Sequence, residues 1–255
     1  MADLRENTAL SAELGSGAKF YETNVASYES QARTFQSAFD AHQRIDALCA
    51  NAGIGDRGSI FILSHRNKDE VPPAPDLTCT DVNWKGVLYG TQLAVHFMRR
   101  NPVPGGVIVA TSSIVAMHPH PSYAEYNGTK AAVLNFVRGS AGVLKGKDNV
   151  RINCVMPGIV DTAIVPRQMI AAVDPRSITP ISNIVSAYMR LIQDESLTGQ
   201  GIECSVDKQL FFPDPPLMNG KHSKRAATVW EPLFKVMHGE HSGLADAIPG
   251  EDLTS

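Results

Sequence analysis

The sequence predicts a single α/β domain built on a mainly parallel sheet with helices on both faces. Short apolar runs alternate along the chain with longer amphipathic stretches, which is typical of repeated βαβ units. The run Gly106–Ala110 (GVIVA) is continuously apolar and β-branched, as in a strand that is covered on both sides. The 255 residues are 43% hydrophobic and 19% charged, which is enough for one large domain with its own core.

The individual elements follow from local patterns. The predicted strands are Ala18–Val25, Ile45–Ala50, Gly106–Ala110, Val150–Met156 and Gly201–Val206. The predicted helices are Ser27–His42, Leu77–Arg100, Tyr123–Leu144 and Ile181–Gln193, each with apolar residues at helical spacing. Ser27 is a candidate N-cap for the first helix. The arginines that end the second helix suit the negative end of its dipole.

Two segments depart from the alternation. Asp56–Asp76 holds three prolines and many charges, and we expect a long loop over one rim of the sheet. Phe212–Ser255 is rich in Pro, Gly and His. This tail either packs on the domain, contacts a partner subunit or is partly disordered.

Composition excludes several classes of function. The net charge of −3 leaves no broad basic field for a nucleic acid, and no apolar run approaches the roughly 20 residues of a membrane span. The N-terminus lacks the pattern of a secretory signal. The four cysteines are scattered without a CxxC pair, so we expect a cytoplasmic protein. The His118–Pro121 turn (HPHP) has no other ligand at suitable spacing, so we expect no metal.

Candidate chemistry lies where the predicted strands end, because ligands bind beyond the carboxyl ends of parallel strands. Asn51-Ala52-Gly53 follows the Ile45–Ala50 strand, and its glycine allows close approach of a ligand to the backbone. An ordinary βα turn would look the same. Ser113 follows the Gly106–Ala110 strand.

Tyr126 and Lys130 stand four residues apart in a predicted helix, so both side chains share one face. A free tyrosine has a pKa of about 10, and a nearby cation favours the phenolate. With a serine hydroxyl to hold the substrate oxygen, such a set moves a proton to or from an alcohol or carbonyl oxygen. Tyrosine and lysine also fall four apart by chance. The serine and the NAG turn at the same edge favour a site.

As a set, these motifs resemble the short-chain dehydrogenase/reductase family. They are the NAG turn Asn51–Gly53, Asn83 in DVNWKG, Ser113 in ATSSIVA, Tyr126–Lys130 in YNGTK and Pro157-Gly158 in VMPGIVDT. The likeness runs from about Asp3 to Phe212, and RINCVMPGIVDTAIV resembles the 15-hydroxyprostaglandin dehydrogenase type. It implies a Rossmann-like domain over residues 1–212 and a tail over 213–255.

The resemblance also implies roles for single residues. Tyr126 would be the general acid/base, and Lys130 would lower its pKa and hold the nicotinamide ribose. Ser113 would orient the substrate oxygen, and Asn83 would position a water in a proton relay. The implied cofactor is NAD, with NADP less favoured. Besides Tyr126 and Lys130, the implied cofactor-binding residues are Asp3, Asn24, Val25, Asn51, Ala52, Gly53, Pro157, Gly158, Ile159 and Thr162.

The implied activity is NAD(P)-dependent interconversion of a secondary alcohol and a ketone on a lipophilic small molecule. The resemblance further implies a homodimer or homotetramer formed through the helices at Leu77–Arg100 and Tyr123–Leu144.

The sequence departs from the family at its start. No TGxxxGxG turn is present, the glycines before residue 50 are Gly15 and Gly17, and Met1–Leu4 resembles the end of the family's second strand. We therefore expect the first strand, the glycine-rich turn and the first helix to be absent, which leaves the neighbouring strands with unpaired edges. Three explanations stay open: a truncated sequence of an ordinary dehydrogenase, a natural short form that acts as a partner or scaffold, and recruitment of Tyr126 to isomerisation or cyclisation. The alternative function is therefore a non-redox pseudoenzyme, isomerase, cyclase or interaction module.

Overall fold

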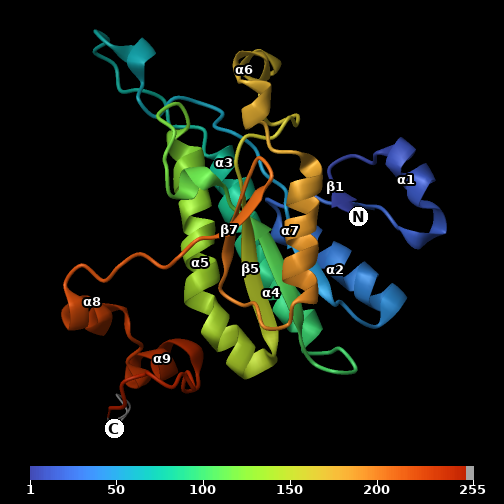
Figure 1. Ribbon diagram of the computed structural model, residues 1–255, viewed down its shortest axis with the longest axis vertical. Coiled ribbons are helices and arrows are strands. Elements are labelled where there is room, and N and C mark those ends of the chain that lie inside the picture. Colours follow the sequence, from blue (N-terminus) through green and yellow to red (C-terminus); the bar gives the residue numbers. More distant parts are fainter. Residues whose placement is uncertain (251–255) are drawn as a thin grey trace.

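The computed structural model describes residues 1–250 and has a central sheet between layers of helices (Figure 1). The five strands run in the order β3-β4-β5-β6-β7, parallel except for the antiparallel pair of β6 and β7. Their bounds are β3 Ala47–Ala50, β4 Gly106–Thr111, β5 Val150–Pro157, β6 Gly201–Ser205 and β7 Lys208–Phe211. The predicted mainly parallel, Rossmann-like α/β fold is confirmed.

Helices cover both faces of this sheet. On one face lie α2 (Tyr28–His42), α4 (Gly86–Met98) and α5 (Ala124–Asp148), and on the other lies α7 (Ile181–Gln193). Successive strand residues point to opposite faces, so Ile108 and Ala110 join the first core and Val107 and Val109 join the second. This two-sided burial explains the continuous apolar run of β4.

Several predicted local signals are confirmed. The Ser27 hydroxyl accepts a hydrogen bond from the backbone N–H of Ser30 at 3.2 Å and so caps α2. The predicted bounds of α7 agree with the structure. The predicted Leu77–Arg100 helix begins with α3 (Thr78–Thr80), passes through a π-helical turn at Asp81–Lys85 and continues as α4.

The N-terminal region differs from the strand pattern that the sequence predicts. The predicted strand Ala18–Val25 shortens to β2 (Tyr21–Glu22), which pairs in parallel with β1 (Ala2–Asp3) as a separate two-stranded sheet. Between them lies the helix α1 (Thr8–Leu14), which the sequence pattern did not predict. Within residues 1–250, β3 pairs only with β4. It is therefore an edge strand of the five-stranded sheet, and the β1–β2 sheet does not extend it.

The remaining elements are short or exposed, and none of the predicted elements covers them. They are α6 (Arg167–Ala172), β7, α8 (Gly220–Ala227) and α9 (Glu231–His238). The tail carries α8 and α9 beside the lower part of α5 (Figure 1), where Lys147 pairs with Glu240 at 3.1 Å. The division into a domain and a tail at residue 213 stays a prediction, and residues 251–255 of that tail lie outside the described residues. Among the described helices, none is both long and apolar enough to cross a bilayer.

Candidate active site

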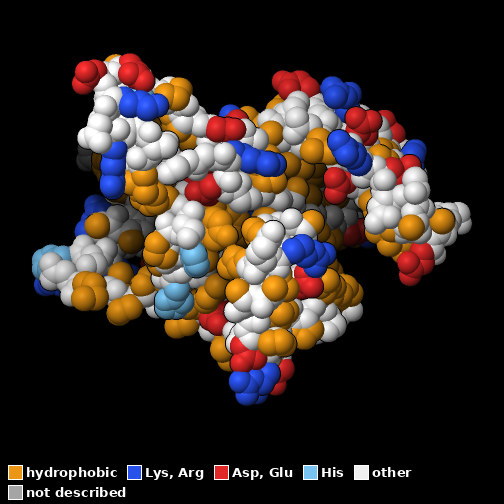
Figure 2. Space-filling model, turned by 90° about the horizontal axis from the view of Figure 1, so that it is seen from above, with side chains coloured by type: hydrophobic (Ala, Val, Ile, Leu, Met, Phe, Trp, Pro, Cys, Tyr) orange, Lys and Arg blue, Asp and Glu red, His pale blue; other side chains and the backbone are white. Residues whose placement is uncertain are grey.

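Ser113, Tyr126 and Lys130 come together at the carboxyl end of the sheet. β4 ends at Thr111, and Ser113 follows as the N-cap of a short 3-10 turn, where its hydroxyl accepts from the N–H of Val115 at 3.3 Å. Tyr126 lies in the first turn of α5 and Lys130 one turn later. Figure 2 looks onto this edge and shows many hydrophobic side chains around it. The predicted trio is therefore one spatial group at the expected rim.

Lys130 is the buried cation of this group. Its side chain is 3% exposed, and Nζ donates to the backbone carbonyl of Thr111 at 2.7 Å and lies 5.4 Å from the centroid of the Tyr126 ring. Burial lowers the pKa of the ammonium to about 8. Near neutral pH the side chain is still mostly charged, and the lost hydration of this buried charge destabilises the folded state.

The phenol of Tyr126 is largely buried. Burial raises its pKa above the ordinary value, and a hydrogen bond with the Ser113 side chain only partly opposes the rise. Burial is the largest cause of the raised pKa, and the Lys130 ammonium donates its hydrogen bond to the Thr111 carbonyl. The lowering of this pKa by Lys130 stays a prediction.

Asn83 is placed by the π-helical turn and is fully buried. Its Oδ1 accepts from the N–H of Ile54, and its Nδ2 donates to the carbonyl of Ile54, both at 2.9 Å. Nδ2 also donates to the hydroxyl of Thr129 on α5 at 3.2 Å. The side chain therefore ties the turn after β3 to α5. Its role in holding a water stays a prediction.

The turns after β3 and β5 carry most of the other predicted cofactor residues. These are Asn51, Ala52, Gly53, Pro157, Gly158, Ile159 and Thr162. Asn51 accepts from the Thr111 hydroxyl at 2.7 Å, which joins the turn to the end of β4. A Cβ added to Gly53 would lie 3.3 Å from Oδ1 of Asn83 and 3.4 Å from Nζ of Lys130. Glycine at this position keeps open a small space beside the ammonium.

Three predicted residues lie elsewhere. Asp3 ends β1, and its carboxylate accepts from the neighbouring N–H of Leu4 at 2.6 Å. Asn24 follows β2 and accepts from the N–H of Ala26 at 3.0 Å. Val25 abuts α4 at Gly86, where an added Cβ would lie 3.2 Å from the Val25 carbonyl oxygen. All three belong to the segment around the two-stranded sheet, and they are not joined to the Ser113–Tyr126–Lys130 group by a hydrogen-bonded strand.

These residues fit one half of a nicotinamide dinucleotide. The buried ammonium of Lys130 and the space kept open by Gly53 suit ribose hydroxyls, and the turn after β5 lies at the same edge. Among the described residues, no glycine-rich turn after a strand opens a helix toward a pyrophosphate. The chain after β1 leads instead into α1, whose first turn is capped by the Asn7 side chain.

Sequence reasoning missed several residues of the site. Asp56 in the long loop accepts the backbone N–H groups of Glu125 and Tyr126, and Glu125 binds Thr80. Cys79 is buried between them. An acidic residue in the first turn of a helix was a usable signal for Glu125. Nothing local to Asp56 shows that it reaches a helix some 70 residues along the chain.

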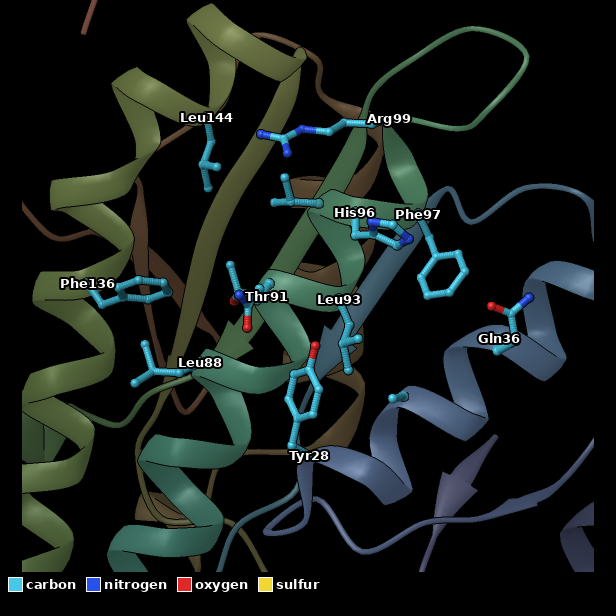
Figure 3. A pocket seen from close by; sticks show the side chains of 13 residues that line it. Tyr28, Gln36, Leu88, Thr91, Leu93, His96, Phe97, Arg99, Phe136 and Leu144 are labelled. Carbon is cyan, nitrogen blue, oxygen red and sulfur yellow. The ribbon is translucent and has the colours of Figure 1, made fainter. Parts of the chain in front are cut away.

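A separate cavity of about 720 Å³ lies on the outer side of α4 (Figure 3). Its lining residues come from α2, α4 and α5, and include Tyr28, Gln36, Leu88, Thr91, His96, Phe136 and Leu144. Neither Ser113, Tyr126 nor Lys130 lines it. The cavity is therefore distinct from the candidate active site.

Comparison with known proteins agrees with this geometry. Residues 2–170 match the family model described as short chain dehydrogenase. A short-chain dehydrogenase/reductase of Penicillium rubens, prx6, is 54% identical over 235 residues, which is 91% of this chain and 79% of that protein. The mouse 15-hydroxyprostaglandin dehydrogenase [NAD(+)] is 25% identical over 76% of this chain and 73% of its own length.

Among solved structures, a 3-ketoacyl-(acyl-carrier-protein) reductase of Brucella melitensis complexed with NADH superposes with a TM-score of 0.64. That match covers 78% of this chain and 81% of the reductase at 19% identity, and it shows a shared fold.

Proposed function

Because the chain belongs to the short-chain dehydrogenase family, we propose that it is an NAD(P)-dependent oxidoreductase that interconverts a secondary alcohol and a ketone. The observation that carries the proposal is the convergence of Ser113, Tyr126 and Lys130 at the carboxyl edge of the sheet. A hydroxyl, a buried phenol and a buried ammonium at one rim are suited to proton transfer at a substrate oxygen.

In this mechanism Tyr126 gives a proton to the carbonyl oxygen during reduction, or takes one from the hydroxyl during oxidation. Ser113 donates a hydrogen bond to the same oxygen and fixes its position. Lys130 holds ribose hydroxyls and places a positive charge near the phenol. When bound, the nicotinamide supplies the hydride acceptor or donor. Because the pKa of Tyr126 is raised, the phenol is protonated near neutral pH, so ketone reduction is favoured there and alcohol oxidation gains with rising pH.

The proposed cofactor is NAD rather than NADP. Support comes from the Asp3 carboxylate at the end of β1, which would meet the adenosine ribose and repel a 2′-phosphate. The mouse relative is named for NAD(+), and the Brucella reductase is complexed with NADH.

The proposed substrate is a lipophilic small molecule. The segment after β5 carries Ile164, Val165 and Met169, and the Tyr123 hydroxyl on the facing side donates to Met169 Sδ at 3.5 Å. Ile164 in this segment is 42% exposed. An apolar-bodied substrate would bury such side chains.

We also propose that the chain pairs as a homodimer, or further as a homotetramer, through α4 and α5. The cavity of Figure 3 lies on this side, with Leu88, Phe136 and Leu144 in its lining. Among the described residues, the buried Thr91 hydroxyl in the same lining has no hydrogen-bond partner. A second copy seated here would cover the apolar lining.

A second candidate is a non-redox protein that keeps Tyr126 as an acid but binds no dinucleotide. The observation that favours it is the break between the β1–β2 sheet and β3. Isomerisation, cyclisation or a binding role would then remain for the same edge.

Calorimetric titration of this 255-residue chain with NAD⁺ and with NADH separates the two candidates. Saturable binding supports the oxidoreductase, and no heat at millimolar cofactor refutes it for this chain. The variant Tyr126→Phe should then bind cofactor but lose turnover, whereas Tyr28→Phe, on the remote α2, should retain both. Turnover that survives in Tyr126→Phe would show that another group transfers the proton.

A further inference from the structure

The first turn of α5 lacks a local cap. The helix begins at Ala124, and the preceding residue, Tyr123, makes no side-chain capping bond. The first N–H groups of a helix have no partner within it. Here Asp56 accepts the N–H of Tyr126 at 2.7 Å and that of Glu125 at 3.1 Å, one with each carboxylate oxygen. A carboxylate suits the positive end of the helix dipole, so a distant loop caps the turn that carries the phenol.

The second carboxylate, that of Glu125, contacts the end of α3. Its Oε1 accepts both the backbone N–H and the hydroxyl of Thr80, each at 2.7 Å. Thr80 ends α3 and directly precedes the π-helical turn with Asn83. Glu125 therefore joins the start of α5 to the segment that positions Asn83.

These bonds close into a ring. Asn83 holds Ile54 by two hydrogen bonds of 2.9 Å, and Ile54 lies two residues before Asp56 in the same loop. Inside the ring, Cys79 donates to the Ile54 carbonyl at 3.3 Å and accepts from Nδ2 of Asn83 at 3.2 Å. The ring thus links the turn after β3, the α3 segment and α5, which carry Gly53, Asn83 and Tyr126.

The same side chains do not make a convincing metal site. Asp56, Cys79 and Glu125 offer ligand atoms within 4.8 Å of one another. However, both Asp56 oxygens and one Glu125 oxygen already accept hydrogen bonds. Burial raises the pKa of the Cys79 thiol to about 11, so it keeps its proton near neutral pH. No second feature points to an ion.

We propose that Asp56 and Glu125 are positioning residues that fix the place of the Tyr126 phenol relative to the Gly53 turn and Asn83. Asp56 acts through the backbone of Tyr126, and Glu125 acts through Thr80. Loss of either carboxylate frees one side of the ring, and the first turn of α5 then frays at the residue that carries the phenol. The effect of this positioning on catalysis rests on the proposed oxidoreductase function.

The first test is a spectrophotometric titration of tyrosinate in Asp56→Ala and Glu125→Ala, each of which removes the acceptor oxygens. For each protein, a second version that also carries Tyr126→Phe is titrated, and its spectrum is subtracted. The difference spectrum then reports the Tyr126 phenol alone. We expect the phenol to ionise at lower pH than in the wild type, because the burial that raises its pKa is relaxed. The exposed Asp69 lies in the same loop, and Asp69→Asn should leave the titration unchanged. An unchanged titration in both ring variants, or an equal shift in Asp69→Asn, would overturn the proposal.

The second test separates positioning from mere stability. In Asp56→Ala, kcat should fall by about 10- to 100-fold, the effect of losing a charged hydrogen-bond acceptor, while the dissociation constant for NAD⁺ changes less than about twofold. Asp56→Asn keeps one acceptor oxygen and should recover part of kcat. If kcat, NAD⁺ affinity and the urea midpoint all fall while the pKa of the Tyr126 phenol stays unchanged, the ring only stabilises the fold and the positioning role is refuted. If the wild type turns over no alcohol, the proposed function fails, and the phenol titration still decides the positioning role.

Discussion

Replacing Lys130 with methionine should stabilise the protein at neutral pH while abolishing its activity. Burial lowers the pKa of this lysine from 10.5 to about 8, so below pH 8 the folded state holds a charge that it disfavours. At 1.36 kcal/mol for each pKa unit, keeping that charge costs about 3 kcal/mol of folding free energy. Methionine removes this cost but loses the hydrogen bond to the Thr111 carbonyl, worth about 1 kcal/mol.

The sign of the pH dependence follows from the depressed pKa. Between about pH 8 and 10.5 the unfolded chain binds more protons at this lysine than the folded chain, so wild-type stability rises with pH. The stability advantage of Lys130→Met over the wild type should therefore be about 2 kcal/mol near pH 7 and should disappear or reverse by pH 10.5.

Urea denaturation of both proteins at pH 7, 9 and about 10.5 measures this difference, in which the titration of all shared groups cancels. Lys145→Met is the matched control, because Lys145 lies exposed on the same helix. A difference between Lys130→Met and the wild type that stays constant over this pH range would refute the reasoning.

Three further predictions concern single positions. Gly53→Ala places a Cβ 3.3 Å from Asn83 Oδ1 and 3.4 Å from Lys130 Nζ, and calorimetry should show NAD⁺ binding weakened by about tenfold, as expected of about 1.4 kcal/mol of overpacking; unaltered affinity would show that this space is not used. Arg151→Met removes a buried guanidinium that donates at 2.7 to 3.0 Å to three carbonyls of α7 and the loop after it, and urea unfolding should show a loss of about 3 kcal/mol; a loss below about 1 kcal/mol would contradict this. Ser27→Ala removes the α2 cap and should cost about 1 kcal/mol, measured in the same way, with no effect on cofactor binding.

The part of the fold that the sequence predicts is the part set by burial on both faces of the sheet. β4 and β5 are recognisable because most of their buried positions carry apolar side chains, and α7 because its buried face recurs at helical spacing. The predicted strand Ala18–Val25 is longer than β2 because its partner β1 pairs with only two of its residues, Tyr21 and Glu22. β7 escaped prediction because it is an edge strand with mostly exposed side chains.

The site divides in the same way. Ser113, Tyr126 and Lys130 were predicted because strand ends and helical spacing are local features of the sequence. The phenol's raised pKa was not, because it depends on how deeply the surrounding chain buries Tyr126. Asp56 could not be found, because its partners are backbone N–H groups of a helix far along the chain, and backbone groups leave no mark in a sequence.

The most direct test of the central claim is the formation of reduced nicotinamide, followed by its absorbance, when a secondary alcohol and NAD⁺ are added to the protein. We predict formation with the wild type and with Tyr28→Phe, at a rate that increases with pH as the Tyr126 phenol ionises, and none with Tyr126→Phe. Equal rates for Tyr126→Phe and the wild type would contradict the assignment of this phenol as the group that moves the proton.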